Sequence, residues 1–344
     1  MRSQLLSTAG AVAELESSTV AWHYGDPLRE QRTLDGDGAI VERARDIVTV
    51  TGPERLTWLH SITTQHLTQL PADTGTELLV LSPHGHIEHH AGVFDDGTTT
   101  WLDTRAGQGA ALADFLVKMR FFTEVEIADV TEQYAFLTVT GPTDLAAADT
   151  AELPDAKFAS GTLPERPTSL YAGASTDDGW ARRTDALTTP TVDIVVKRDR
   201  LGHKVTELGR PLAGTWAFDT LRIPCAYPEV GVDTDHKTIP HEVPWLLVAA
   251  VHLDKGCYRG QETVARVHNL GKPPRMLSIL HLDGISEHAP EAGTDITLDG
   301  RVVGRVGTAS RHYEDGMIAL ALLRRNVRER EDPKLSIGDT VAAL

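Results

Sequence analysis

The sequence predicts an α+β protein of more than one domain, and three observations support this fold class. At 344 residues the chain exceeds the size that one hydrophobic core usually fills. A strand that leads through a Gly-Pro turn into a helix occurs twice, at Val48-Thr-Val-Thr-Gly-Pro53 and at Leu137-Thr-Val-Thr-Gly-Pro142. From Lys272 onward, short apolar segments are separated by Asp-Gly turns, which is typical of a small β-barrel or sandwich.

The pattern of apolar residues places the individual elements. We expect strands at residues 46–51, 77–81, 87–94, 98–102 and 125–130, with helices at 54–70 and 109–122. The second occurrence of the pattern predicts strands at 135–140 and 191–197, a helix after residue 142 and a helix at 212–223. Two further helices, at 243–252 and 261–269, precede the β-rich end of the chain.

Composition limits the partners and the compartment. The chain has 33 basic and 49 acidic residues, a formal charge of −16, which repels phosphate backbones and argues against nucleic acid as a general partner. The arginine-rich run at 324–330 is more typical of a solvated face than of a binding patch. No signal peptide or membrane-spanning run is expected, and the two cysteines, Cys225 and Cys257, suit a reducing compartment. We therefore expect a soluble, cytoplasmic protein without a membrane partner.

One glycine-rich segment between two expected helices has the residues for a reactive thiol. Gly256 and Gly260 permit a tight loop, and Cys257 would lie just before a helix N-terminus between Lys255 and Arg259. The helix dipole and both cations would favour the thiolate. The alternative is a small buried side chain in a turn. The candidate site is the octapeptide Lys255, Gly256, Cys257, Tyr258, Arg259, Gly260, Gln261 and Glu262, with Cys257 and Lys255 as its candidate catalytic residues.

This octapeptide carries a family resemblance. The run Lys-Gly-Cys-Tyr-x-Gly-Gln-Glu-x-Val-Ala-Arg at 255–266 resembles the signature of the YgfZ family. Residues 46–65, 218–242 and 300–325 resemble the first, middle and last blocks of the wider glycine-cleavage T-protein superfamily. The cysteine octapeptide is the most specific part, because it distinguishes YgfZ-type proteins from the aminomethyltransferases.

The resemblance implies a T-protein-like fold of three domains around a central folate-binding opening, with two α+β ferredoxin-like units and a C-terminal β-barrel. The expected boundaries are 1–50 with 135–225 for the first unit, 51–134 with 226–271 for the second, and 272–344 for the barrel. It also implies tetrahydrofolate or a one-carbon derivative as ligand. The partners implied are iron–sulfur enzymes or their assembly proteins, with the cysteine essential. Two cysteines cannot themselves supply the four thiolates of a cluster.

Four positions outside the octapeptide are candidate folate contacts through the same resemblance. Glu207 matches the T-protein glutamate that binds the pterin, although a solvated glutamate is the alternative. Arg222 matches a family arginine that could pair with the glutamate tail of folate or with a carboxylate across a domain interface. Trp216 and Phe218 fall where the family places an aromatic near the ligand, with helical core packing as the alternative role.

One departure argues against a working aminomethyltransferase. The T-protein catalytic aspartate lies in a Gly-x-Ile-x-Asp-Asp run, and here His89 and His90 stand at both aspartate positions. A folate-dependent aminomethyltransferase or related one-carbon transfer enzyme remains the alternative function, and an oxidase-linked folate enzyme would need a flavin domain or partner. His86, Glu88 and His90 would share one strand face and could bind zinc or iron, but we favour a polar face lining the opening. No metal ligands are therefore assigned.

Overall fold

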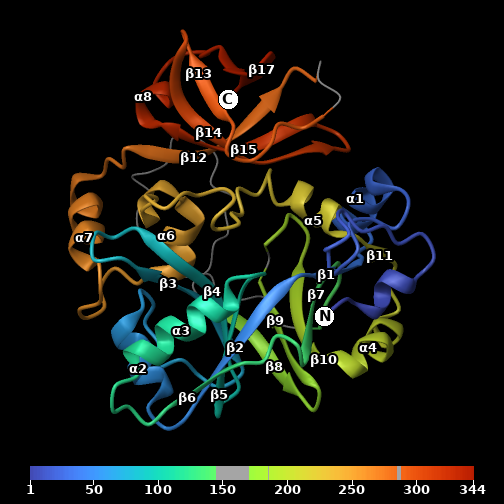
Figure 1. The fold of residues 1–344 in the computed structure, drawn as a ribbon, viewed down its shortest axis with the longest axis vertical. Helices are drawn as coiled ribbons and strands as arrows, with labels where there is room; N and C mark the ends of the chain where they lie inside the picture. The colour runs from blue at the N-terminus through green and yellow to red at the C-terminus, as the bar shows by residue number, and fades with distance from the viewer. Residues whose placement is uncertain (145–169, 185, 285–287) are drawn as a thin grey trace.

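A strongly twisted, mostly antiparallel sheet forms the base of the molecule, and a β-barrel lies over it (Figure 1). The computed structural model describes residues 1–144, 170–184, 186–284 and 288–344. Within these ranges, eleven strands form one sheet in the order β11-β1-β7-β10-β9-β8-β3-β4-β5-β2-β6, and six more close the barrel in the order β12-β15-β14-β13-β16-β17. The α+β fold class and the C-terminal β-barrel are thereby confirmed.

The sheet has two halves that join between β3 and β8. Its strands are β1 (Ile40–Arg43), β2 (Arg45–Thr51), β3 (Thr74–Leu81), β4 (Ile87–Asp95), β5 (Thr99–Arg105), β6 (Glu126–Asp129), β7 (Tyr134–Thr140), β8 (Tyr171–Thr176), β9 (Gly179–Arg183), β10 (Thr191–Lys197) and β11 (Leu212–Ala213). The chain crosses from one half to the other at Ala44, between β1, which pairs with β7, and β2, which pairs with β5 and β6. The domain boundaries inferred from the resemblance remain a prediction.

Short helices flank the sheet, and the barrel follows them. The helices are η1 (Gln4–Ser7), α1 (Pro27–Asp35), α2 (Arg55–Ile62), α3 (Gly109–Met119), η2 (Arg198–Arg200), α4 (Leu201–Leu208), α5 (Thr215–Leu221), η3 (Pro240–Glu242), α6 (Pro244–Ala250), α7 (Gln261–Leu270) and α8 (Arg325–Arg328). The barrel strands are β12 (Arg275–Leu282), β13 (Asp295–Leu298), β14 (Arg301–His312), β15 (Gly316–Arg324), β16 (Leu335–Ile337) and β17 (Thr340–Ala343). No helix in the described ranges is long and apolar enough to cross a membrane.

Three expected helices are shorter than their apolar spacing predicts. The helix expected at 54–70 ends at Ile62, because the following residues hydrogen bond to β3, with the Thr64 N–H donating to the Leu79 carbonyl at 3.0 Å. The helix expected at 212–223 begins at Thr215, since β11 pairs in parallel with β1. The helix expected at 109–122 ends at Met119. The helix expected after residue 142 lies mostly outside the described residues.

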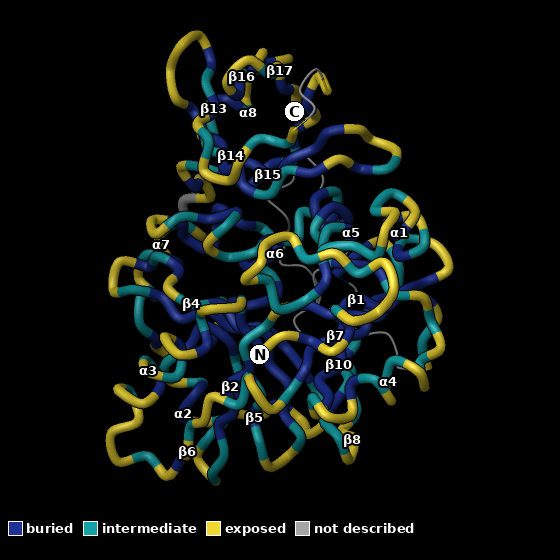
Figure 2. Tube along the Cα trace, turned by 45° about the vertical axis from the view of Figure 1, so that its right-hand side comes forward, coloured by how far each residue is buried: buried dark blue, intermediate teal, exposed yellow. Residues whose placement is uncertain are grey.

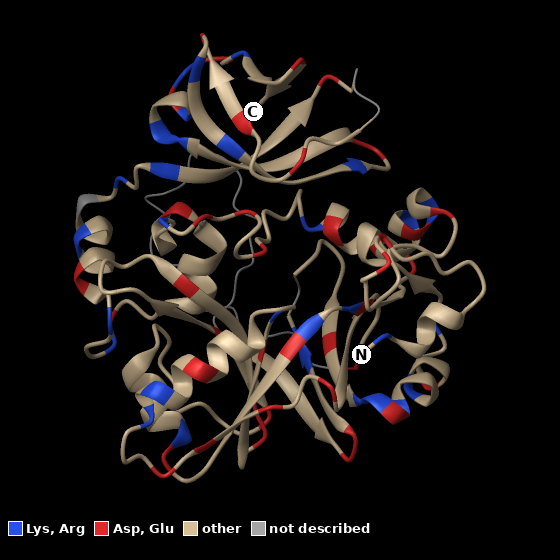
Figure 3. Cartoon of the chain, in the orientation of Figure 1, with Lys and Arg blue, Asp and Glu red and all other residues tan. Residues whose placement is uncertain are grey.

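Separate apolar clusters fill the space on the two faces of the sheet and inside the barrel (Figure 2). One cluster joins α6 to β3 and to the barrel strands β12 and β15, so it holds the barrel over the sheet. A second lies between α2, α3 and strands β2 to β5. Charged residues also occur on the strands in the middle of the sheet and not only on the outer helices (Figure 3). These central charges belong to the candidate site.

Candidate functional site

The cysteine octapeptide forms the end of the loop between α6 and α7 and the first two residues of α7, and it packs tightly against the β3–β4 turn. Gly260, the N-cap of α7, has a φ of +82°, and a Cβ there would lie 2.6 Å from the Ser82 carbonyl oxygen. Gly85 in the turn has a φ of +80°, and a Cβ there would lie 2.6 Å from Cβ of Thr263. Only glycine fits at both positions without displacing backbone or side chain. The two glycines therefore let the loop and the turn meet.

Lys255 points into the protein and caps the end of α2. Its ammonium donates hydrogen bonds to the carbonyl oxygens of Thr63 at 2.6 Å and Gln65 at 3.0 Å, and also to that of His60. The residue is 6% exposed, and burial lowers the pKa of its amine to about 8. Its three donors are thus used by backbone carbonyls at and just after the end of α2, and a role for Lys255 as a cation beside the thiol stays a prediction.

The second expected cation is also engaged elsewhere. Arg259 forms a fork-like pair with Glu88 of β4, at 3.0 and 3.4 Å. Cys257 itself is exposed and lies three residues before the N-cap of α7, whereas Tyr258 packs into the apolar cluster beneath the barrel. Stabilisation of a thiolate by Lys255 and Arg259 is not supported by this geometry. The exposure of Cys257 excludes the alternative of a buried small side chain.

The remaining octapeptide residues hold the loop in shape. The side-chain amide of Gln261 donates to the Lys255 carbonyl at 3.3 Å, while Glu262 lies on the first turn of α7 and is exposed. Gly256 has open space around its Cα, so its backbone faces outward next to Cys257. The loop thus presents one thiol on a firmly attached backbone.

Two adjacent cavities lie between the sheet and the barrel. The first has a volume of about 650 Å³ and extends along β4 and the β3–β4 turn to the barrel, and the second has a volume of about 740 Å³ and extends from the N-terminal segment to α5. Arg105 and Glu229 line both cavities. Their size lies within the range of small-molecule sites. The polar residues of the first cavity are Ser82, His84, His86, Glu88, His89, His90, Thr104, Arg105, Gln108, Glu229, Thr234, Asp235, His236 and Arg305.

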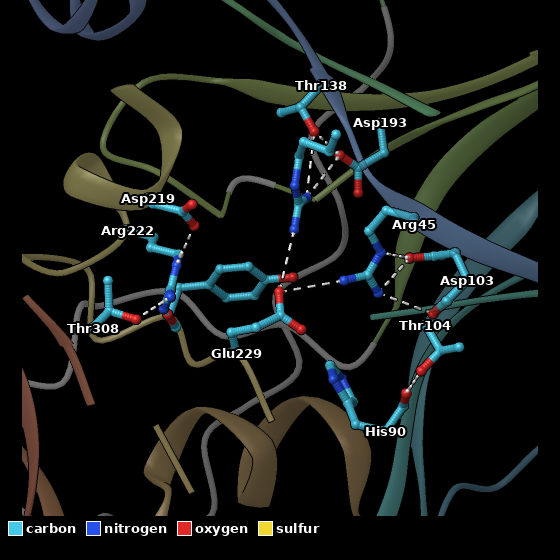
Figure 4. A network of polar contacts seen from close by, with 12 residues as sticks. Arg45, His90, Asp103, Thr104, Thr138, Asp193, Asp219, Arg222, Glu229 and Thr308 are labelled. Carbon is cyan, nitrogen blue, oxygen red and sulfur yellow. Dashed lines mark hydrogen bonds and ion pairs between the residues drawn. The ribbon is translucent and has the colours of Figure 1, made fainter. Parts of the chain in front are cut away.

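A buried network of arginines and carboxylates connects to Arg43 and Glu229, which line the second cavity (Figure 4). Arg45 pairs with Asp103 at 2.9 Å, and Arg182 pairs with the other oxygen of Asp103 at 2.7 Å. Burial alone would raise the pKa of Asp103, but Arg182 and Arg45 lower it to about 2. Glu229 stands at the edge of this network, 3.6 Å from Arg45 and 3.9 Å from Arg43. Its contacts are long, so its carboxylate keeps acceptor capacity for a ligand.

The structure separates the four predicted folate contacts. Phe218 and Arg222 line the second cavity, whereas Trp216 stacks on Trp22 with ring centroids 4.4 Å apart and donates to Ser310 at 2.8 Å. Glu207 lies on α4 and lines neither cavity, and its side chain is 55% exposed and paired with Lys204.

Arg222 is held by a nearby carboxylate and by a barrel hydroxyl, and its two predicted roles stay predictions. It is fully buried, pairs with Asp233 at 2.6 Å and donates to the hydroxyl of Thr308 in the barrel. Phe218 is also buried, with the Arg43 guanidinium 4.0 Å from its ring.

The histidine segment does not have the alternation that its sequence predicts. In the β3–β4 ladder Val80 is opposite His89 and Leu81 is opposite Ile87, so Glu88 is an extra residue in a β-bulge. The expectation that His86, Glu88 and His90 share one face is therefore wrong. No group of three or more His, Cys, Asp or Glu side chains is arranged to hold a metal ion within the ranges that the structure describes.

Two residues of the site were not identified from the sequence. Glu77 is buried behind His90, with its carboxylate 2.7 Å from Nε2 of the imidazole, and Glu229 lies between the two cavities. Glu77 sits in an apolar strand, where a lone acidic residue is a usable signal of a buried polar contact. Glu229 follows a turn that has no such signal.

Comparison with known proteins agrees with this geometry. Residues 275–344, which begin at the first strand of the barrel, match the CAF17 C-terminal β-barrel domain family. The tRNA-modifying protein YgfZ of Escherichia fergusonii is 26% identical over 289 residues, which cover 82% of this chain and 84% of that protein. The resemblance to the YgfZ family is confirmed.

One further relative and one solved structure of similar fold extend the comparison. A chloroplastic protein of Arabidopsis thaliana is 25% identical over 269 residues, which cover 75% of this chain, and the chain spans 58% of the length of that protein. The crystal structure of the glycine cleavage system aminomethyltransferase T from Bartonella henselae superposes with a TM-score of 0.78 at 16% identity, covering 98% of this chain and 94% of that one. The T-protein-like fold expected from the sequence is thereby confirmed.

Proposed function

We propose that this chain binds a reduced folate in the cavities beneath the barrel and supports iron–sulfur proteins through Cys257. The likeness to YgfZ and the T-protein-like fold support a folate-related family. The observation that carries the proposal is the attachment of the cysteine loop to the cavity wall. Gly260 and Gly85 hold the loop against the turn that lines the first cavity, so the loop with its one exposed thiol is attached to the wall of a ligand-sized space.

Glu229 replaces Glu207 as the carboxylate that we assign to the pterin. The pterin ring offers an amino group and a ring N–H side by side, and a carboxylate accepts both hydrogen bonds. Glu229 lines both cavities, whereas Glu207 is exposed and paired on α4. Arg43 and Arg45 lie 3.9 and 3.6 Å from Glu229 and do not occupy its carboxylate at close range.

Equilibrium binding of tetrahydrofolate, followed by calorimetry, tests this assignment. We expect Glu229→Gln to weaken binding by about tenfold, because a charge-assisted hydrogen bond becomes a neutral one. Glu207→Gln is the matched control and should bind like the unaltered protein. Equal affinities for all three proteins would contradict the assignment of Glu229, and no binding to the unaltered protein would contradict folate binding itself.

The iron–sulfur role is tested by complementation. Deletion of the gene should lower the activities of iron–sulfur enzymes, and the unaltered gene should restore them. We expect Cys257→Ala to fail in this assay and Cys225→Ala, which alters the buried second cysteine, to succeed. Rescue by Cys257→Ala would refute a role for the thiol.

Direct binding of tRNA is not part of the proposal, although the YgfZ relative is named a tRNA-modifying protein. The net charge of −16 opposes phosphate binding, and the arginine-rich run near α8 is partly neutralised. Arg325 pairs with Glu329 at 3.2 Å and Arg330 with Asp299 at 3.4 Å. Stable retention of tRNA by the purified protein at physiological salt would contradict this interpretation.

A further inference from the structure

A buried carboxylate stands directly behind one histidine of the first cavity. Glu77 of β3 is 4% exposed, and three side chains converge on it from three elements. One carboxylate oxygen lies 2.7 Å from Nε2 of His90 on β4, and the other lies 2.5 Å from the hydroxyl of Tyr171 on β8 and 3.1 Å from Nε1 of Trp245 on α6. Both carboxylate oxygens therefore have partners among the described residues.

The donors around Glu77 fix the proton positions of the pair. An indole nitrogen can only donate, and Tyr171 keeps its proton because burial and the charge of Glu77 raise the pKa of the phenol. Burial alone would raise the pKa of Glu77, but the hydrogen bond and charge of His90, with the hydrogen bonds from Tyr171 and Trp245, lower it. Glu77 is therefore an ionised acceptor, and Nε2 of His90 carries the proton between them.

The imidazole of His90 also borders the first cavity. His90 lines the first cavity, and Figure 4 shows its ring pointing toward Glu229. The Thr104 hydroxyl donates to the His90 carbonyl at 2.8 Å and holds the strand backbone in place. In the neutral tautomer that donates Nε2–H to Glu77, Nδ1 of His90 has a lone pair and is a hydrogen-bond acceptor.

We propose that the Glu77–His90 pair supplies the central cavity with a fixed hydrogen-bond acceptor at Nδ1, and that this acceptor selects a reduced pterin over an oxidised one. A tetrahydropterin carries N–H donors at ring nitrogens N5 and N8, whereas the aromatic pterin of folic acid has lone pairs there. An acceptor at Nδ1 can accept a hydrogen bond from an N–H group of the reduced ring, whereas it would face another lone pair in the oxidised ring. Glu77 is the positioning residue and His90 is the ligand contact. This inference rests on the proposed folate binding.

Glu77→Gln is the decisive substitution because it reverses the polarity of His90 and keeps every hydrogen bond. The amide oxygen still accepts from Tyr171 and Trp245, while the amide NH2 donates to Nε2 of His90. The proton of the neutral imidazole then moves to Nδ1, which becomes a donor. His90→Phe removes the contact altogether at similar volume. His203→Phe, on exposed α4, is the control.

The test compares the dissociation constants of tetrahydrofolate and folic acid at about pH 8, where an ordinary imidazole is neutral. We expect the unaltered protein and His203→Phe to prefer tetrahydrofolate, and His90→Phe to reduce that preference about tenfold. Glu77→Gln should lower the preference further, to the point where folic acid binds at least equally well. An unchanged ratio of affinities in Glu77→Gln would overturn the proposal while leaving folate binding intact.

A second measurement needs no folate. Nitrogen-15 NMR distinguishes the two neutral imidazole tautomers, and the His90 signals are assigned by their loss in His90→Phe. We expect the Nε2–H tautomer in the unaltered protein and the Nδ1–H tautomer in Glu77→Gln. The same tautomer in both proteins would overturn the inference. If neither pterin binds the unaltered protein, both the proposed folate binding and the proposed preference for a reduced pterin fail. The NMR measurement then still tests whether Glu77 fixes the tautomer of His90.

Discussion

Replacing Gly260 by alanine should detach the cysteine loop from the cavity wall. The left-handed φ of +82° is unfavourable for a residue with a Cβ, at a cost of about 1 kcal/mol. The added carbon would also lie 2.6 Å from the Ser82 carbonyl oxygen and 3.0 Å from Cα of Gly85. Both atoms belong to backbone, which cannot rotate away, so overpacking adds about 2 kcal/mol. The expected total is about 3 kcal/mol.

Gly271 at the other end of α7 provides a matched control. Its φ is +64°, and an added Cβ would have no atom within 4 Å, so Gly271→Ala carries the conformational cost of about 1 kcal/mol alone. The difference between the two variants, about 2 kcal/mol, isolates the contact between loop and turn. Chemical denaturation gives the free energies of unfolding, and hydrogen exchange should show faster opening of residues 82–86 only in Gly260→Ala. Equal destabilisation by both substitutions would refute the reasoning.

Three further substitutions test the buried charges. Lys255→Met keeps the side-chain stem but leaves three carbonyls without their donor, so the free energy of unfolding should fall by about 3 kcal/mol in denaturant titrations, and no loss would refute the capping role. Burial raises the pKa of Glu42 from 4.5 to about 7, although the hydrogen bond from Ser3 and the charge of Arg198 act in the opposite direction. The folded state therefore loses stability as the pH rises from 4.5 to about 7. In thermal melting, Glu42→Gln should stabilise the protein by up to about 3 kcal/mol at pH 8 and by little near pH 4.5. Arg222→Met should release the barrel from α5, visible as a separate, lower melting transition, and a single unchanged transition would count against the clamp.

Sequence patterns predict the elements whose stability is local. The strand expected at 191–197 coincides with β10, because its nearly continuous run of β-branched residues fits a central strand that is buried on both faces. The helix expected at 54–70 is too long, since residue 64 gains more from pairing with β3 than from another helical turn. Local propensity decides the first case, and tertiary contact decides the second.

The residues of the candidate site also divide into those that local sequence predicts and those whose position depends on tertiary contacts. The exposed cysteine loop is visible in the sequence, because its glycines and its helix start are local features. The direction of Lys255 is not, since it depends on the carbonyls that follow α2, about 190 residues earlier in the chain. The partnership of Glu77 with His90 depends on the bulge at Glu88, which no spacing rule in a single sequence reveals.

The buried ion pairs explain how a sheet with a weak seam can hold a defined cavity. Among the residues that the structure describes, the ladder between β3 and β8 has two paired positions, Thr74–Ala172 and Gly75–Tyr171. Arg182 of one half compensates by pairing with Asp103 of the other at 2.7 Å, and such a buried pair is costly to break. The seam is therefore fixed by charge where backbone pairing is short.

The Glu77–His90 pair lies along that same seam, because Tyr171, which donates to Glu77, belongs to β8. The resemblance to the T-protein leads one to expect a carboxylate at the cavity surface, where this chain has His89 and His90. Here the negative charge stands one layer deeper, at Glu77, and reaches the cavity as an imidazole nitrogen of fixed polarity. A site arranged in this way recognises a ring N–H without placing a second anion beside Glu229, and that arrangement suits binding of a reduced pterin better than transfer of a group from it.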